Sequence, residues 1–486
     1  MLKASKCSRL LFIFTLFITT VTHANTDPVS QLFGIKINGA GIPVYDYKDF
    51  TYAYFEQNGK VSIVITFAQP VDDVKISPVH RDIQFVKKDR TIQFDLLQPE
   101  YTVVTVNKKQ RLFLFAEEEL QSNQSDTLKI TDYVTKGDTG VSTQSIQKAL
   151  DAASATGKQL VFTAGTYTSG SLFIHSNTKL FFEKGAVLKA SENLADYVLN
   201  KEIGARIFIT VKDAQNVVVN GSGIIDGSGR AIRDKFGDKG RIRLFTIHHS
   251  EKVALSGITL RDPAAWNTHI FKSQEVHIKH LKLLNDITVP TTDGFDPDAS
   301  SGINIENCFA YCSDDNVAVK LTPRNEETLI TKNIRVSGCV FLTLKSSLKI
   351  GTETRGASIS DVLFENNDVI QADRGMAIYA TDGAIIENVR YINNRFEESY
   401  LDLKQMAVQF RLNKRDAESR LGQIKNVLVK DCNFYVRFPK PSEVSGFDKD
   451  HKTEVVFDNL QIGGKKCLNI SDADIQTAAF SDITFK

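Results

Sequence analysis

Three carboxylates lie close together in the middle of this sequence. Asp293 stands in Thr292-Asp293-Gly294, and the adjacent pair Asp314-Asp315 follows 21 residues after Asp293. Hydrolysis of a glycosidic bond needs one carboxylic acid to protonate the leaving oxygen and a second carboxylate to activate water. The cluster therefore indicates glycosidic bond cleavage, provided that the fold brings the two segments together. The alternative is that these acids only close turns.

A repeated unit surrounds these acids, in which a polar residue or glycine precedes a short strand of alternating apolar residues. The first apolar residues of the copies are Val217, Val253, Val276, Ile303, Ile334, Val362, Val389 and Val427. Successive copies are therefore separated by 36, 23, 27, 31, 28, 27 and 38 residues. Such a period, with short strands and frequent Gly and Asn, indicates a β-solenoid. The 21 residues from Asp293 to Asp314 fit about one coil.

Helical patterns are rare in this chain, which argues against a doubly wound α/β sheet. The segment from Thr143 to Ala155 reads as an amphipathic helix with Ile146, Ala149, Leu150 and Ala153 on one face. We expect it to cap the solenoid, because the first coil otherwise exposes an apolar cross-section.

The chain divides into four parts. Residues 1–24 have the basic, apolar and small-residue regions of an export signal, so we expect a mature chain that begins near Asn25. Residues 25–120 read as a small antiparallel, sandwich-like β domain. Residues 121–130 are the expected linker, and residues 131–486 the solenoid domain. The apolar run of the signal is too short for a membrane span, so we expect an exported protein, periplasmic or extracellular.

The composition gives few hints of partners. The formal net charge is +1, which provides no general attraction to nucleic acid or to an anionic membrane. Five cysteines follow the signal, and no zinc spacing or calcium loop is visible, so we expect buried free thiols, no metal and no cofactor. We expect a monomer whose partner is a polysaccharide.

Several stretches resemble glycoside hydrolase family 28, the polygalacturonase family. They include Gly165-Thr166-Tyr167, Glu183-Lys184-Gly185-Ala186-Val187, Asn220-Gly221-Ser222-Gly223-Ile224-Ile225-Asp226-Gly227 and Trp266-Asn267-Thr268-His269. The resemblance covers roughly residues 130–460. It implies a right-handed parallel β-helix and hydrolysis of an acidic, pectic polysaccharide.

The catalytic signatures of that family are partly present. Its Asn-Thr-Asp-Gly appears as Thr291-Thr292-Asp293-Gly294, and its Asp-Asp pair appears as Asp314-Asp315. By the resemblance, Asp314 is the general acid, Asp293 and Asp315 hold and deprotonate water, and the anomeric centre is inverted. Electrostatics supports these different roles. Three carboxylates on coils about 4.8 Å apart repel one another when ionised, so one of them should keep its proton near neutral pH.

Two other signatures of the family are replaced. Its Gly-His-Gly has Ser346 at the histidine, and its Arg-Ile-Lys has Ala377 and Tyr379 at the cations. Strand alternation directs a set of polar side chains outward beside the acids. These expected cleft residues are Lys320, Lys349, Tyr379, Gln409 and Arg411. Three are cationic, which favours an anionic sugar; alternatively, the lysines only neutralise the aspartates.

Four further residues are candidates for substrate binding. Lys345 and Arg374 flank the same strands and would line the rim of the cleft. Trp266, the only tryptophan, could be a sugar platform or a core residue, and His269 could contact substrate or relay a proton.

Three other functions remain open. The enzyme could hydrolyse a sulfated or neutral polysaccharide. It could be a polysaccharide lyase, with calcium held by Asp293, Asp296, Asp298, Asp314 and Asp315. It could also be a noncatalytic carbohydrate-binding solenoid that has lost the family's histidine. The sequence decides neither endo nor exo action, nor the role of the N-terminal domain.

Overall fold

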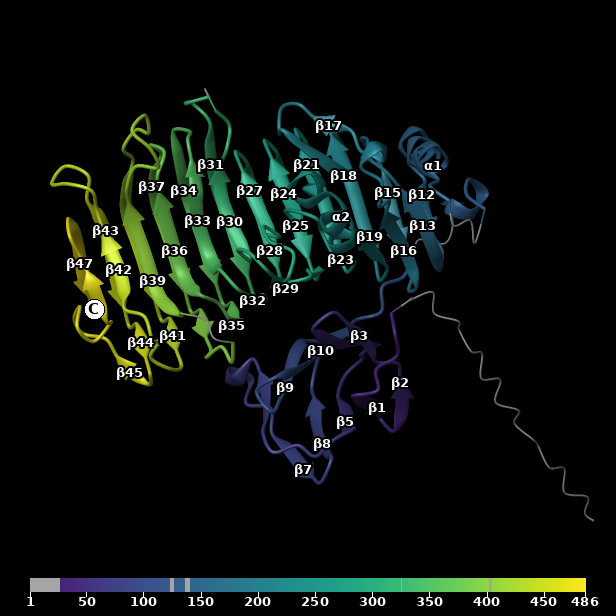
Figure 1. Cartoon of the computed structure of the whole chain (residues 1–486), viewed down its shortest axis with the longest axis horizontal. Coiled ribbons are helices and arrows are strands. Elements are labelled where there is room, and N and C mark those ends of the chain that lie inside the picture. Colours follow the sequence, from purple (N-terminus) through teal and green to yellow (C-terminus); the bar gives the residue numbers. More distant parts are fainter. Residues whose placement is uncertain (1–26, 123–125, 136–139, 325, 402–403) are drawn as a thin grey trace, which may run out of the picture.

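The computed structural model describes residues 27–122, 126–135, 140–324, 326–401 and 404–486. The predicted export signal lies outside these residues. The described chain forms a long parallel β-helix, with a smaller β domain against one side of it (Figure 1). The predicted fold class is confirmed. No helix in the described ranges is both long and apolar enough to cross a membrane.

Three sheets form the described solenoid. The first contains β11 (Thr127–Lys129), β12 (Gln159–Phe162), β15 (Lys179–Phe182), β19 (Gln215–Gly221), β22 (Glu251–Ser256), β25 (Gln274–Lys279), β28 (Ser301–Glu306), β31 (Ile330–Ser337), β34 (Ser358–Glu365), β37 (Ile385–Ile392), β40 (Gln423–Lys430), β43 (Thr453–Asp458) and β47 (Ser481–Phe485). The second contains β13 (Gly165–Ser169), β16 (Ala186–Ala190), β20 (Ile224–Asp226), β23 (Thr259–Arg261), β26 (Lys282–Leu284), β29 (Phe309–Cys312), β32 (Val340–Thr343), β35 (Asp368–Gln371), β38 (Arg395–Phe396), β41 (Asn433–Phe434), β44 (Gln461–Ile462) and β45 (Lys465–Lys466).

The third sheet positions the acids. It contains β14 (Leu172–Ile174), β18 (Ala205–Lys212), β21 (Ile242–His248), β24 (Thr268–Phe271), β27 (Phe295–Asp298), β30 (Val317–Leu321), β33 (Ser346–Thr354), β36 (Arg374–Ala380), β39 (Met406–Leu412), β42 (Ser442–Ser445) and β46 (Ile475–Thr477). A short strand, β17 (Leu199–Asn200), pairs with β18. The helical segments are α1 (Thr143–Thr156), α2 (Gly229–Phe236), η1 (Val79–Arg81), η2 (Ile130–Asp132), η3 (Leu194–Asp196) and η4 (Gly237–Gly240).

In several coils, the residue before the first apolar residue of the repeat has an unusual backbone conformation. Asn216, Asn333, Asp361, Asn388 and Asn426 all have positive φ, between 49° and 59°. Asn and Asp tolerate this left-handed conformation better than most residues. The strands can therefore bend at these positions, and the following valine or isoleucine points into the core.

Helix α1 caps the solenoid as predicted. Its buried residues are Ile146, Ala149, Leu150 and Ala153, and they join the core cluster that continues along the whole solenoid. The five described cysteines are buried and free, in agreement with the expected buried thiols.

The N-terminal domain has two five-stranded sheets within the described residues. One contains β2 (Ala40–Ile42), β1 (Phe33–Ile37), β5 (Val61–Phe67), β8 (Thr91–Leu96) and β7 (Phe85–Lys88). The other contains β3 (Tyr45–Tyr47), β4 (Phe50–Glu56), β10 (Gln110–Glu117), β9 (Tyr101–Val106) and β6 (Val74–Ser77). The pairs are antiparallel except for β4 and β10, which run parallel. Strand β11 already belongs to the solenoid, which thus begins within the expected linker.

An aromatic cluster joins the two domains. Phe50, Phe113 and Phe115 pack against Phe309 and Tyr311 of the second sheet. This contact buries large apolar side chains from both sides, so the N-terminal domain is packed against the solenoid.

Candidate active site

The fold brings the three catalytic candidates together. Asp293 precedes β27, and Asp314 and Asp315 precede β30, the neighbouring strand of the third sheet (Figure 1). The Gly294 N–H donates to the Asp315 carbonyl at 2.8 Å. One carboxylate oxygen from each aspartate lies within 4.8 Å of the others. The separation of one coil seen in the sequence therefore becomes a direct contact in space.

Glycine 294 is required by this close approach. A Cβ atom at this position would lie 2.4 Å from the carbonyl oxygen of Asn316. That distance is far below van der Waals contact, so a side chain here would push the Asp293 segment away from the next coil. Asn316 itself is fully buried, and its amide donates to the carbonyls of Ala310 and Leu342 at 3.1 and 2.9 Å.

Two lysines hold two of the three acids. Lys320 Nζ lies 2.8 Å from Asp293 Oδ2, and Lys349 Nζ lies 2.6 Å from Asp315 Oδ2. Burial acts to raise the pKa of Asp315, but the Lys349 ammonium holds that pKa below its ordinary value. Asp315 therefore stays ionised at neutral pH.

Asp314 has the opposite environment. Burial, together with the negative charges of Asp293 and Asp315, raises the pKa of Asp314 to about 7. Its Oδ1 accepts a 3.0 Å hydrogen bond from the Asp315 N–H. A carboxyl group that keeps its proton near neutral pH can serve as a general acid.

A fourth acid, Asp296, lies beneath the cluster. Asp296 is fully buried, and its Oδ1 lies 2.8 Å from the same Lys320 ammonium. Only the approach of Lys320 to Asp293 has the geometry of a hydrogen bond. Burial raises the pKa of Asp296 well above its ordinary value. No role in the hydrolytic site was predicted for Asp296 from the sequence. The alternation of side chains on β27 could have indicated that Asp296 points outward, toward the other acids.

The expected cleft residues share one face of the third sheet. Lys349 pairs with Ala377 and Ala377 with Gln409, while Tyr379 pairs with Arg411. The Arg411 guanidinium lies 4.5 Å from the Tyr379 ring centroid, and Lys349 Nζ lies 5.1 Å from it. The Tyr379 hydroxyl donates to Gln409 Oε1. These side chains therefore form one polar surface that begins at Asp315.

Comparison with known proteins places the chain in a family. The sequence profile of glycosyl hydrolases family 28 matches residues 153–479, more than half of the chain. The chain belongs to this family. It is therefore a glycoside hydrolase, as predicted.

Curated relatives of this family 28 chain are distant. It is 26% identical over 299 residues to a probable polygalacturonase of Vitis vinifera, an alignment that covers 56% of this chain and 60% of the relative. It is 28% identical over 291 residues to an endo-polygalacturonase of Pectobacterium carotovorum subsp. carotovorum, an alignment that covers 54% of this chain and 70% of the relative. The chain thus spans 60–70% of the length of these relatives.

Solved structures share the fold. An exopolygalacturonase of Yersinia enterocolitica superimposes with a TM-score of 0.62 at 19% identity, over 93% of this chain and 95% of that one. An exopolygalacturonase of Thermotoga maritima superimposes with a TM-score of 0.63 at 17% identity. That superposition covers 76% of this chain and 92% of the Thermotoga protein. These likenesses agree with the right-handed parallel β-helix expected for this family 28 hydrolase.

Ser346 links two candidate residues in the family 28 site. Its N–H donates to Asp315 Oδ1 at 3.0 Å, and its hydroxyl accepts from Arg374 Nε at 2.9 Å. Arg374 Nη1 also forms an ion pair with Asp373 at 2.8 Å. The guanidinium of Arg374 is therefore bonded to both Ser346 and Asp373. Lys345 is exposed beside them. Ser346 therefore helps to hold the Asp315 segment.

Trp266 and His269 occupy different environments in this glycoside hydrolase. Trp266 is partly exposed. Lys320 Nζ lies 3.7 Å from the centroid of its ring, and the Arg243 guanidinium lies 4.0 Å from it. His269 is fully buried, with Arg243 2.6 Å from its Nδ1 and Asp298 3.1 Å from its Nε2. Burial and the Arg243 charge lower the pKa of His269 to about 3. The His269 side chain has no exposed surface in this structure, and its expected contact with substrate stays a prediction.

Proposed function

We propose that this protein is an exported, inverting glycoside hydrolase that cleaves a uronate-containing, pectic polysaccharide. The observation that carries the proposal is the unequal environment of the three aspartates. Lys320 and Lys349 bind Asp293 and Asp315, whereas the pKa of Asp314 is raised to about 7. Asp314 then protonates the leaving oxygen, while Asp293 and Asp315 orient a water molecule and accept its proton.

The proposal of inversion depends on the two lysine contacts. Oxygens of the three acids lie within 4.8 Å of one another, closer than the separation of about 6.5–9.5 Å usual for carboxyl pairs of inverting enzymes. Spacing alone would therefore favour retention. However, an ammonium group beside each of Asp293 and Asp315 weakens either oxygen as a nucleophile on carbon, and two carboxylates can share one water. Proton NMR of the first anomer released tests this point, and initial retention would overturn it.

An anionic substrate follows from the cations of the cleft. Among the described residues, no acid forms an ion pair with the half-buried Arg411 guanidinium, which lies over the Tyr379 ring. A carboxylate of the substrate would pair with this guanidinium through charge-assisted hydrogen bonds. The relatives named polygalacturonases support a galacturonate-type sugar.

A calcium-dependent lyase is less well supported by the same geometry. Calcium would need several oxygens of Asp293 and Asp315, and the Lys320 and Lys349 ammonium groups already lie 2.8 and 2.6 Å from them. An added dication would also meet two fixed positive charges. The donor set therefore favours direct hydrolysis.

The test is an activity screen of the purified mature protein. Polygalacturonate, rhamnogalacturonan, a sulfated galactan and a neutral galactan would be compared by release of reducing ends and by absorbance of unsaturated products. We expect reducing ends from a uronate polymer without new absorbance. Cleavage of the neutral or sulfated polymer alone would refute the substrate class, and unsaturated products would refute hydrolysis. N-terminal sequencing of secreted protein tests export, with a start near Asn25 expected.

A further inference from the structure

A cavity lies on the same sheet as the acids, at a distance from them. Its volume is about 310 Å³, and residues of β14, β17, β18 and β21 line it. Thr210 in its wall belongs to a register row that continues through Thr246, His269 and Asp296. The row is three strand spacings long, so the cavity is about 14 Å from the acid cluster. One sugar ring cannot reach both places, whereas an oligosaccharide can.

The walls of this cavity combine apolar and cationic groups. Val198 and Leu199 are 58% and 49% exposed, and the half-buried Phe173 ring lies beside them. Lys201 and Lys212 are exposed in the same wall, and neither forms an ion pair with another described residue. An apolar surface beside unpaired cations is suited to the C–H face and the carboxylate of a uronic acid.

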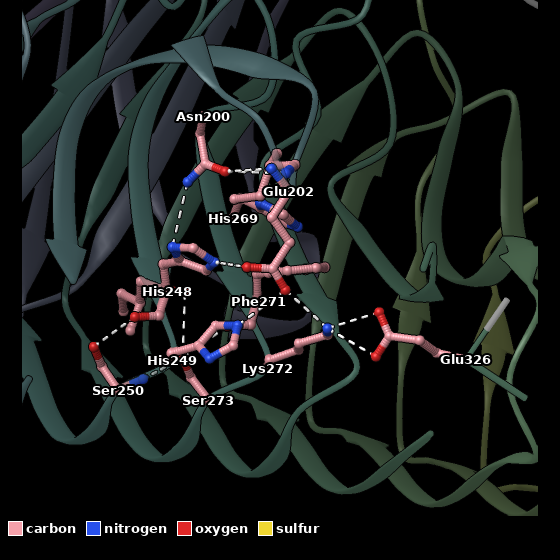
Figure 2. Close-up of polar contacts among 12 residues, drawn as sticks. Asn200, Glu202, His248, His249, Ser250, His269, Phe271, Lys272, Ser273 and Glu326 are labelled. Atoms are coloured by element: carbon pink, nitrogen blue, oxygen red, sulfur yellow. Dashed lines mark hydrogen bonds and ion pairs between the residues drawn. The ribbon is translucent and has the colours of Figure 1, made fainter. Parts of the chain in front are cut away.

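A polar cluster fixes the wall of the cavity. Glu202 accepts from His248 at 2.9 Å, from His249 at 3.0 Å and from Lys272 at 2.8 Å (Figure 2). Lys272 also binds Glu326 at 2.9 Å. Despite burial, these bonds lower the pKa of Glu202 to about 2. The segment that carries Val198, Leu199 and Lys201 is therefore held in place before any ligand binds.

The hydrogen bonds of this cluster argue against a metal site, although Glu202, His248 and His249 have suitable spacing. Asn200 Oδ1 accepts from the N–H groups of Glu202 and Ile203, so its amide nitrogen faces His248 Nδ1 (Figure 2). Nδ1 must then be the acceptor, and Nε2 carries the proton that Glu202 accepts. A metal on Nε2 would move the ring proton to Nδ1, where it would face the Asn200 amide N–H instead of an acceptor.

We propose that this cavity is a distal subsite that binds one uronate residue of the polymer while the acids cleave the chain elsewhere. Asp213 also lines the cavity and is the one acid of its wall besides the paired Glu202. Lys201 and Lys212 outnumber it, so the unpaired charge is positive. The inference rests on the proposed function for its substrate class.

The test compares variants across substrate lengths. Phe173→Ala and Lys212→Ala should raise KM about fivefold or more for long oligogalacturonides, the effect of one exposed charged contact, and leave KM for the shortest cleaved oligomer unchanged. Lys332→Ala, an exposed lysine on the first sheet, is the matched control and should change neither. Equal effects on short and long substrates, or no effect on either, would overturn the subsite.

Binding separates this inference from the proposed function. Calorimetry with a galacturonate octamer would use Asp314→Asn, with and without Lys212→Ala. Weaker binding of the double variant supports the subsite even if the wild-type enzyme cleaves no uronate polymer, a result that would refute only the proposed function. Equal binding by both variants, or no binding by either, refutes the subsite. Octamers with carboxylates reduced to alcohols should lose the dependence on Lys212, and a retained dependence would refute uronate as the ligand.

Discussion

The ammonium group of Lys349, on β33, lies 2.6 Å from a carboxylate oxygen of Asp315, which precedes the neighbouring strand β30. Lys349 is 8% exposed and Asp315 2%, so this ion pair forms out of bulk water. Among the three candidate catalytic acids, the pair leaves Asp314, the residue before Asp315 in the chain, as the one with the raised pKa. The division of roles among the acids depends on this contact.

Replacement of the acid should abolish most turnover. Asp314→Asn is expected to lower kcat at least about a hundredfold while substrate affinity stays nearly unchanged, because the amide cannot donate a proton to the leaving oxygen. Steady-state kinetics and calorimetry measure the two effects. Asp361→Asn, at an exposed position on the first sheet, is the control. A fully active Asp314→Asn enzyme would show that another group is the acid.

The same variant should stabilise the protein above neutral pH. The folded-state pKa of Asp314 is about 7 against an ordinary value of 3.8, so between these pH values the folded state binds more protons than the unfolded state. Stability therefore falls as pH rises from about 4 to 7. Asn has no such penalty, so the Tm of Asp314→Asn should exceed that of the wild type at pH 8, with a smaller difference at pH 4. A constant difference would contradict the raised pKa.

Loss of Lys349 should move the pH profile of kcat/KM. In the wild type, activity should fall as pH rises through about 7, when Asp314 loses its proton. The Lys349 charge lowers the pKa values of both Asp314 and Asp315. In Lys349→Met, both limbs of the profile should therefore shift to higher pH. Unshifted limbs with a raised KM would instead assign Lys349 to substrate binding alone.

Arg411 should discriminate by substrate charge. Arg411→Gln is expected to raise KM about tenfold for a uronate oligomer, because a charge-assisted hydrogen bond is lost, and to leave KM for the carboxyl-reduced oligomer unchanged. Arg390→Gln, an exposed arginine on the first sheet, is the control. If both substrates lose affinity equally, Arg411 only supports the Tyr379 ring.

The contact between domains should contribute to stability. Lys282 is 1% exposed and forms an ion pair with Glu117 of the N-terminal domain. Glu117→Gln leaves a buried ammonium group without its counterion, so we expect a loss of about 3 kcal/mol in the free energy of unfolding. Glu56→Gln removes an exposed interdomain pair with Lys184 and should cost less than about 1 kcal/mol. Equal losses in urea denaturation would mean that the Lys282 site admits water.

The sequence by itself determined the coil and the placement of the acids. Asn or Asp precedes the first valine or isoleucine in five of the eight copies of the repeat, and alternation directs the next side chains inward or outward. Both signals are local, so the solenoid, the cap helix and the outward directions of Lys349 and Tyr379 could be predicted. The one-coil spacing of Asp293 and Asp314 then placed the acids together.

Only the tertiary structure decided which groups are paired and which are buried. The sequence left open whether the lysines bind substrate or neutralise aspartates, and the structure shows Lys320 and Lys349 bonded to Asp293 and Asp315. It likewise buries His269 under Arg243 and Trp266, and pairs Lys282 with a glutamate 165 residues away. Pairing and burial depend on segments that meet only after the coils stack, and no local pattern encodes those distances.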